Sequence, residues 1–160
     1  MTQRPSPLQR ELKQRRAFAS RAQEAAIGLL RTADVVRRRI AVVIEPSGLS
    51  LPQYNVLRIL RGAGPAGLAT LEVADRLIER APGITRLCDG LERRGLLERT
   101  RSREDRRVVE CRITPAGAAL LAGLDEPVAE ADAASIGRLS GAEIERLVEL
   151  LDRVREEPAR

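Results

Sequence analysis

Histidine and tryptophan are absent from this chain of 160 residues, and phenylalanine and tyrosine each occur once. Without histidine the chain can build neither a Ser-His-Asp triad nor a Cys-His pair, and most zinc sites are excluded as well. The glycine-rich phosphate-binding motifs of nucleotide-binding folds are also missing. The acidic residues have the spacing of a solvent-exposed surface. We therefore expect no enzymatic activity, no catalytic residues, no metal and no cofactor.

Long apolar runs are missing too. No stretch approaches the roughly 18 apolar residues of a membrane-spanning helix. Residues 1–16 are polar and basic, unlike a signal peptide. We therefore expect a soluble, cytoplasmic protein.

Positive charge in this chain is almost entirely arginine, because Lys13 is the only lysine among 28 basic residues, against 23 acidic ones. Arginine forms bidentate contacts with phosphates and guanine edges that lysine cannot form, although a GC-rich genome would equally favour arginine codons. Residues 1–39 carry ten basic and three acidic groups, whereas residues 116–160 carry five basic and ten acidic ones. This asymmetry suggests a nucleic-acid partner and also an interaction between the two ends.

The composition favours a helical fold. Hydrophobic residues make up 43% of the chain, but with so few aromatics the core has to consist of Leu, Val, Ile and Ala. The length is compatible with one domain that buries a substantial core.

An amphipathic helix is predicted from about Pro82 to Arg94, ended by a left-handed glycine at Gly95. At helical spacing one side is apolar, and it consists of Ile84, Leu87, Cys88 and Leu91. The other side is polar, and it consists of Arg86, Asp89, Gly90 and Arg93. One side therefore belongs to a core and the other to a polar partner.

A β-hairpin is predicted directly after this helix, with strands at residues 96–101 and 107–113 and a charged connector at residues 102–106. Four arginines crowd its tip, namely Arg101, Arg103, Arg106 and Arg107. Crowded like charges cost stability, so a negatively charged partner is implied. A helix sized for the major groove, followed by a cationic hairpin that could enter the minor groove, is typical of a winged helix-turn-helix.

The two cysteines, Cys88 and Cys111, each fall on the predicted apolar side of their element. A disulfide framework is not expected. Each is either a small core residue or, for Cys88, a thiol whose oxidation would disturb DNA binding.

Two shorter helices are predicted before the amphipathic one. Ser50 and Gln53 form a capping box for a helix at residues 51–61, whose inner face would carry Tyr54, Leu57 and Leu60. Residues 62–67 form a Gly/Pro loop, and Thr70 can cap a helix at residues 71–79. This arrangement fits a helix-turn-helix, although many unrelated helical hairpins look similar.

The ends of the chain are predicted to be helical. After a disordered segment at residues 1–7, one helix is expected from Leu8 to Ile44, with a heptad seam at Ala22, Ala26, Leu29, Ala33, Val36, Ile40 and Val43. The seam indicates packing against a partner chain or within one chain. Thr114 and Pro115 open a helix to about Ile136 that could kink at Pro127. Ser140 and Glu143 open the last helix, whose apolar stripe is Ile144, Leu147, Val148, Leu151 and Val154.

The segment from Leu51 to Pro115 resembles the MarR family of transcriptional regulators. The resemblance is carried by the helices LPQYNVLRIL, TLEVADRLI and ITRLCDGLERRGLLER, by the wing SREDRRVVECRIT and by the following TPAG. It implies a mainly α fold, with a winged helix-turn-helix domain, a two-stranded β-wing and an N- and C-terminal helical dimerisation region. The corresponding domains are residues 1–7 (disordered), 8–49 (first dimerisation helix), 50–113 (DNA-binding lobe) and 114–160 (last dimerisation helices).

The resemblance further implies a homodimer, in which Asp105 orients Arg107 of the wing for the minor groove. It also implies a small-molecule effector in a crevice between the dimerisation helices and the DNA-binding lobe, where Tyr54 is the obvious aromatic. We expect a repressor that binds an inverted-repeat operator in double-stranded DNA. The candidate DNA-binding residues are Thr70, Pro82, Gly83, Thr85, Arg86, Arg93, Arg101, Arg103, Asp105, Arg106 and Arg107.

Alternatives from other classes remain. A winged-helix protein–protein adaptor that has lost DNA binding would more often present an apolar surface than an arginine-rich wing. An RNA-binding winged helix is disfavoured by the lack of stacking aromatics.

Overall fold

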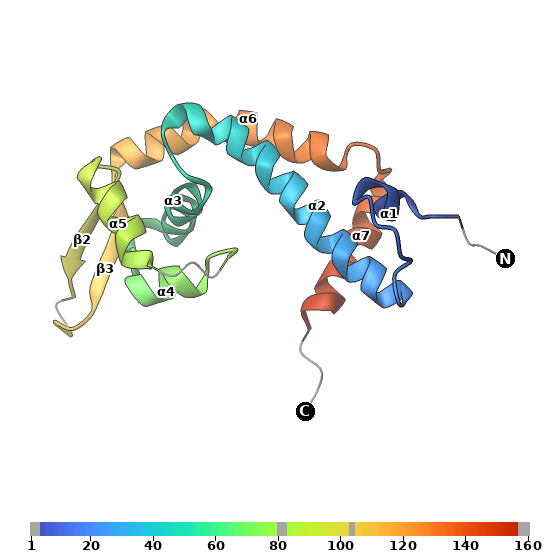
Figure 1. Ribbon diagram of the computed structural model, residues 1–160. Helices are drawn as coiled ribbons and strands as arrows, with labels where there is room; N and C mark the ends of the chain where they lie inside the picture. Colours follow the sequence, from blue (N-terminus) through green and yellow to red (C-terminus); the bar gives the residue numbers. More distant parts are fainter. Residues whose placement is uncertain (1–3, 80–82, 103–104, 157–160) are drawn as a thin grey trace. The chain divides into compact units, whose positions relative to one another are not determined.

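The computed structural model describes residues 4–79, 83–102 and 105–156 (Figure 1). The chain separates into two compact units, Met1–Arg38 and Arg39–Arg160.

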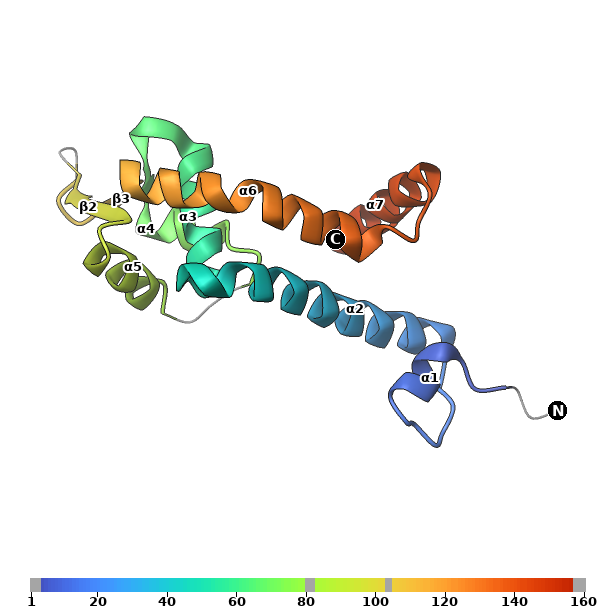
Figure 2. The same cartoon turned by 90° about the horizontal axis from the view of Figure 1, so that it is seen from above.

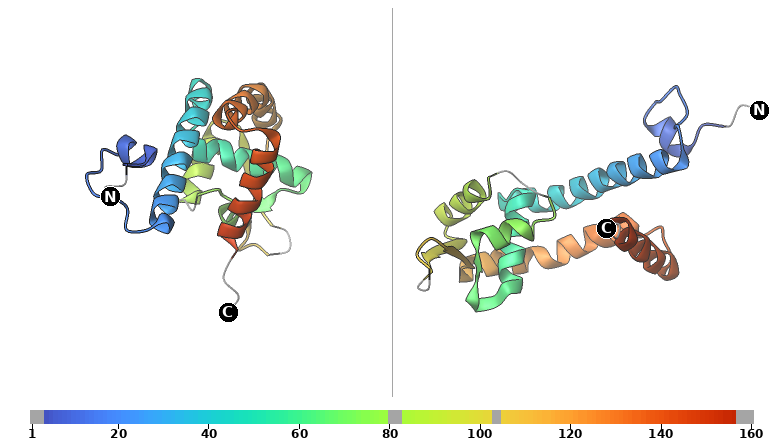
Figure 3. Two further views of the ribbon diagram at one scale, coloured as in Figure 1. Left: turned by 90° about the vertical axis from the view of Figure 1, so that its right-hand side faces the viewer. Right: turned by 90° about the horizontal axis from the view of Figure 1, so that it is seen from below.

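The first unit contains the short helix α1 (Pro7–Glu11) and most of α2 (Arg21–Ile44). Ser6 caps α1, and Arg31 of α2 pairs with Glu11 at 2.8 Å. Figure 3 shows the turn of chain that separates the two helices.

The prediction of one continuous helix from Leu8 to Ile44 is therefore wrong. Lys13 adopts a left-handed backbone conformation after α1, and side-chain hydrogen bonds of Ser20 and Gln23 cap the start of α2. In this cap the Gln23 amide donates to Ser20 Oγ at 3.1 Å and the Ala19 amide donates to Gln23 Oε1 at 2.7 Å. The predicted disordered segment is also too long, because Pro7 is helical. Residues 1–3 lie outside the described part of the chain.

The second unit begins with the end of α2, the one-turn helix η1 (Glu45–Ser47) and α3 (Leu51–Ala63). The predicted capping box is confirmed, since the Ser50 amide donates to Gln53 Oε1 at 3.0 Å and the Gln53 amide donates back to Ser50 Oγ at 3.4 Å. The predicted inner face is confirmed as well, because Tyr54, Leu57 and Leu60 are buried.

The helix-turn-helix continues with α4 (Thr70–Asp75) and α5 (Ile84–Arg93). The first of these helices is shorter than the predicted residues 71–79. After Asp75 the chain leaves the helix, with Leu77 still in the core and the Ile78 amide donating to Asn55 Oδ1 of α3 at 3.0 Å. The side chain of Asn55 thus replaces the helical carbonyl that the Ile78 amide would have bonded if α4 had continued.

The sheet has three antiparallel strands in the order β1-β3-β2, where β1 is Leu68–Ala69, β2 is Leu97–Arg101 and β3 is Val109–Ile113. The β2–β3 hairpin forms the wing at one end of the second unit (Figure 3). The predicted two-stranded wing corresponds to β2 and β3, and β1 is a third strand of the sheet that was not predicted. The expected loop at residues 62–67 instead contains the end of α3 and the one-turn helix η2 (Gly64–Ala66), which leads into β1.

The last two helices are α6 (Pro115–Ile136) and α7 (Gly141–Arg155). The predicted caps are confirmed, since the Gly117 amide donates to Thr114 Oγ1 at 3.1 Å and the Ser140 amide donates to Glu143 at 2.8 Å. α6 continues through Pro127. α3 and α6 are neighbours (Figure 2) and are joined by a bidentate ion pair of Arg61 with Asp125 at 2.7 and 2.8 Å.

The core of the second unit is aliphatic, as the composition predicts. Its fully buried side chains are Ile44, Val56, Leu57, Leu60, Val73, Cys88, Leu91, Leu97, Cys111 and Leu121. Tyr54 is the one aromatic among the buried described residues. No helix in the described ranges is long and apolar enough to cross a membrane.

We predict that two glycines of α6 respond oppositely to alanine. A Cβ at Gly117 would lie 2.2 Å from the Leu96 carbonyl oxygen, whereas a Cβ at Gly123 meets nothing within 4 Å. Gly117→Ala should lower the free energy of unfolding by about 1 to 3 kcal/mol. Gly123→Ala should raise it by about 0.5 to 1 kcal/mol. Urea denaturation of both variants measures this, and equal effects would contradict the close contact at Gly117.

Candidate nucleic-acid interface

The predicted recognition helix is α5, and both of its ends are set by glycines. Gly83 is the N-cap with φ +97°, so the helix starts after the predicted Pro82, which lies outside the described residues. At the other end Gly95 has φ +67°, as predicted. The Gly95 amide donates to Glu92 O at 2.8 Å and the Leu96 amide donates to Leu91 O at 3.0 Å, which is a Schellman motif.

The two sides of α5 differ as the sequence predicts. Cys88 and Leu91 are fully buried, and Ile84 and Leu87 are half-buried against the core. The exposed residues are Gly83, Thr85, Arg86 and Arg93. Gly90 is an exception to the predicted polar side, because a Cβ there would lie 2.9 Å from Gln53 Nε2 of α3.

The two exposed arginines of α5, Arg86 and Arg93, are not neutralised by neighbouring carboxylates of the described residues. Among the described residues no carboxylate forms an ion pair with Arg86 or Arg93. The Arg93 guanidinium donates to the backbone carbonyl of Asp89 in its own helix, at 3.3 Å. Both guanidinium groups can therefore meet an anionic ligand.

The wing carries a second group of exposed arginines, consisting of Arg101, Arg106 and Arg107. Asp105 accepts the backbone amide of Arg107 on Oδ1 at 2.9 Å and the amide of Val108 on its carbonyl at 2.9 Å. The carboxylate therefore shapes the turn through the backbone amide of Arg107. Its expected role in orienting Arg107 for the minor groove stays a prediction. The predicted Arg103 lies outside the described residues.

Thr70 does not have its predicted role as a helix cap. It is the first residue of α4, and Ala69 is the N-cap. Its hydroxyl donates to Val109 O at 3.0 Å and lies 3.4 Å from Cys111 Sγ. The hydroxyl is thus engaged with β3 inside the lobe, because β1 brings the start of α4 against that strand.

Arg99 of β2 was not among the predicted site residues, because no local pattern in the sequence distinguishes it from the other arginines. Its Nη2 lies 2.6 Å from Asp89 Oδ1 and 2.5 Å from Glu92 Oε2, and its Nε donates to Glu92 Oε2 at 2.9 Å. The hydrogen bond to Glu92 raises the pKa of Arg99 and lowers that of Glu92. The carboxylate of Asp89, on the predicted polar side of the helix, therefore pairs with the wing.

The two cysteines, from α5 and β3, lie together in the core. Both are free and fully buried, and the two thiols interact. The neighbouring thiol raises the pKa of Cys88 and lowers the pKa of Cys111, because the first proton leaves the pair more readily and the second is held more tightly. Their burial fits the interpretation as core residues.

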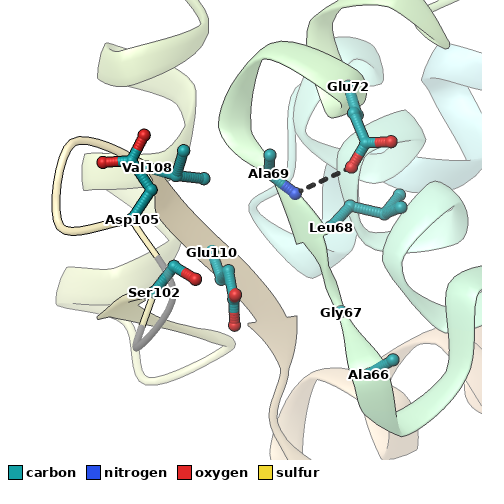
Figure 4. Close-up of a pocket in the computed structure, with 9 residues that line it drawn as sticks. All are labelled: Ala66, Gly67, Leu68, Ala69, Glu72, Ser102, Asp105, Val108 and Glu110. Carbon is teal, nitrogen blue, oxygen red and sulfur yellow. Dashed lines mark hydrogen bonds between the residues drawn. The ribbon is translucent and has the colours of Figure 1, made fainter.

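A hollow of about 310 Å³ lies between the wing and the β1–α4 connection (Figure 4). Three carboxylates line it, and each already has a partner in the protein. Glu72 accepts the Ala69 amide, Asp105 accepts the Arg107 amide and Glu110 pairs with Arg112. Glu72 therefore caps α4, Asp105 shapes the turn of the wing, and Glu110 pairs within β3.

A helix-turn-helix followed by a β-wing, with arginines exposed on both, defines a winged helix-turn-helix protein. The MarR family model matches residues 49–109. The regulator MhqR of Bacillus subtilis is 35% identical over 112 residues, which are 69% of this chain and 75% of that protein. The repressor Rv2887 of Mycobacterium tuberculosis is 27% identical over 135 residues, covering 83% and 96% of the two chains.

Solved structures agree. A MarR transcription factor from Planctomyces limnophilus is 44% identical with a TM-score of 0.66, covering 85% of this chain and 98% of that one. BpsR of Bordetella bronchiseptica, whose DNA binding is regulated by 6-hydroxynicotinic acid, is 27% identical with a TM-score of 0.73, covering 83% and 99%. The chain belongs to the MarR family, a family of DNA-binding transcriptional regulators and not of enzymes, as the sequence predicts.

We predict that neither cysteine reacts with a thiol reagent in the native protein. Each side chain is fully buried, so a bulky reagent such as dithionitrobenzoate reaches it only after unfolding. Both thiols should be labelled in guanidinium chloride and neither in buffer, as followed by the absorbance of the released thiolate. Rapid labelling of the folded protein would show that α5 and β3 separate readily.

Proposed function

We propose that this protein binds an inverted-repeat operator in double-stranded DNA as a homodimer and represses transcription, and that a small molecule releases it. The observation that carries this proposal is the pair of exposed arginine groups in one unit. Arg86 and Arg93 lie on the outer side of α5, and Arg106 and Arg107 lie at the tip of the wing. Arginine is the residue best suited to phosphates and guanine edges.

The recognition helix supplies the major-groove contacts. Arg86 and Arg93 would reach base edges or phosphates. Gly83 and Thr85 are small and exposed at the N-terminal end, so backbone amides there can approach a phosphate. Two such helices in a dimer would read half-sites about one helical turn apart.

The wing supplies the minor-groove and phosphate contacts. The turn shaped by Asp105 presents Arg106 and Arg107 side by side with exposed side chains. Arginine is favoured in a narrow, A·T-rich minor groove because the electrostatic potential there is strongly negative. Arg101, at the end of β2, adds a further phosphate contact.

Dimerisation is supported by apolar side chains that the single chain leaves uncovered. In the heptad seam of α2, Ala22, Ala26, Leu29 and Ala33 are exposed, with Leu29 at 40%. In α7 no residue is buried, and Val148 and Val154 of the apolar stripe are 52% and 67% exposed. The basic N-terminal and acidic C-terminal segments add complementary charge.

Repression and release by a ligand are supported by the relatives. Rv2887 is a repressor, and the DNA binding of BpsR responds to 6-hydroxynicotinic acid. Tyr54, the aromatic first considered for a ligand crevice, is 4% exposed and lies under Arg58, 5.8 Å from its guanidinium. The effector would therefore meet mainly aliphatic and polar side chains.

The proposal is tested by selecting bound sequences from random duplex DNA with the purified protein, followed by a salt titration on the enriched site. We expect an imperfect inverted repeat and a steep loss of affinity with salt, with a logarithmic slope of about −0.9 for each phosphate neutralised. Sedimentation of the complex should give two chains per duplex. No enrichment and a flat salt response would favour the protein–protein adaptor instead.

On the enriched operator, Arg107→Ala should weaken binding by about 1 to 3 kcal/mol, mostly at A·T-rich steps under the wing. Arg61→Ala is the matched control, because Arg61 lies on neither the recognition helix nor the wing and pairs with Asp125 of α6 at 2.7 Å. Fluorescence anisotropy with operator duplexes measures both. Unchanged affinity of the Arg107 variant would refute the assignment of the wing as a DNA contact.

A further inference from the structure

We propose that Arg99 is the positioning residue that holds the wing at its working distance from the recognition helix, so that both parts of one subunit reach their grooves together. This inference rests on the proposed function and deepens it. It assigns a role to a residue whose guanidinium is engaged by protein carboxylates rather than left available for DNA.

The geometry is that of a clamp between β2 and α5. Asp89 and Glu92 are three residues apart, so they project from the same part of the helix surface. The Arg99 guanidinium joins both, with Nη2 at 2.6 Å from the first carboxylate and 2.5 Å from the second. One side chain of the wing therefore fixes two points on the recognition helix.

Partial burial makes this clamp stronger than an ordinary surface ion pair. The Arg99 side chain is 23% exposed, against 43% for Asp89 and 38% for Glu92. Fully exposed pairs contribute little because water and salt screen them. A guanidinium that is mostly covered and satisfied by two carboxylates loses less to screening and holds its geometry more tightly.

The sheet register carries this constraint to the wing tip. Arg99 is paired with Cys111 of β3, and Arg101 is paired with Val109. The strand pairing ends there, and Arg106 and Arg107 lie beyond it. A change in the angle of β2 at Arg99 is therefore enlarged at the tip, which is the part proposed to enter the minor groove.

Charge acts in the same direction. Asp89 and Glu92 belong to the helix whose outer side carries Arg86 and Arg93. Without Arg99, two carboxylates would lose their cation beside a surface that is proposed to approach phosphates. Loss of the clamp should therefore both misplace the wing and add local repulsion.

The test compares wild-type protein with Arg99→Gln, Asp89→Asn and the double variant, on the operator found by selection. Affinity and hydroxyl-radical footprints are measured together. Arg99→Gln should bind about tenfold more weakly. It should lose protection under the wing while keeping the major-groove protection of α5. The double variant should bind no more weakly than Arg99→Gln, because both changes break the same clamp.

Arg61→Gln is the matched control, since it removes another bidentate arginine–carboxylate pair from the same unit, between α3 and α6. It should leave the footprint unchanged. Arg99→Lys keeps the positive charge but loses the bidentate guanidinium, so its operator affinity should lie between those of the wild-type protein and Arg99→Gln. It replaces Arg99→Gln in the test if circular dichroism shows that Arg99→Gln does not fold.

Three results would overturn the inference, namely a uniformly weaker but unaltered footprint for Arg99→Gln, additive losses in the double variant, or Arg99 variants that bind like the wild-type protein. Failure of the wild-type protein to select an operator would instead remove the proposed function itself. Wild-type binding that the Arg99 variants reproduce would remove only the positioning role.

Discussion

The junction at which α5 ends and α6 begins is the contact on which the DNA-binding lobe depends. Thr114 donates its hydroxyl to the Gly95 carbonyl at 2.7 Å, and its amide donates to Leu96 O at 3.2 Å. The same hydroxyl accepts the Gly117 amide and so caps α6. One threonine therefore ties the end of the recognition helix, the start of β2 and the start of α6 together. The close approach of Gly117 to Leu96 leaves no room for a side chain there.

From this junction the orientation of α5 follows. The Schellman turn at Gly95 sends the chain directly into β2, and Leu96 and Leu97 enter the core. The hairpin then covers the side of α5 that carries Cys88 and Leu91. Because small and aliphatic side chains fill this contact, helix and sheet can approach closely, and the opposite side of α5 has to face outward with its arginines.

The arginines of this lobe fall into two groups, those that form ion pairs within the protein and those that are exposed without such a partner among the described residues. Arg99, Arg112 and Arg61 are engaged by carboxylates and hold strands and helices in place. Arg86 and Arg107 have no such partner among the described residues and remain for an anionic ligand. Simple counting of arginines cannot separate these two groups, since the difference lies in which carboxylates the fold brings within reach.

The sequence by itself determined the features that depend on neighbouring residues. The caps at Ser50 and Thr114, the left-handed Gly95 and the two sides of α5 could all be predicted, because each rests on hydrogen bonds or periodicity within a few residues. Even so, a local signal was missed at Ser20 and Gln23, where a second cap interrupts the expected first helix.

Only the tertiary structure decided the remaining features, because they join residues far apart in the chain. β1 consists of two residues and exists through its pairing with β3. Thr70 turns toward the sheet because that strand is there, and Cys88 meets Cys111 only once α5 and β3 are packed. Asp89 likewise pairs with Arg99 only because the hairpin packs beside α5, and no spacing in the sequence marks Arg99 as the residue that reaches it.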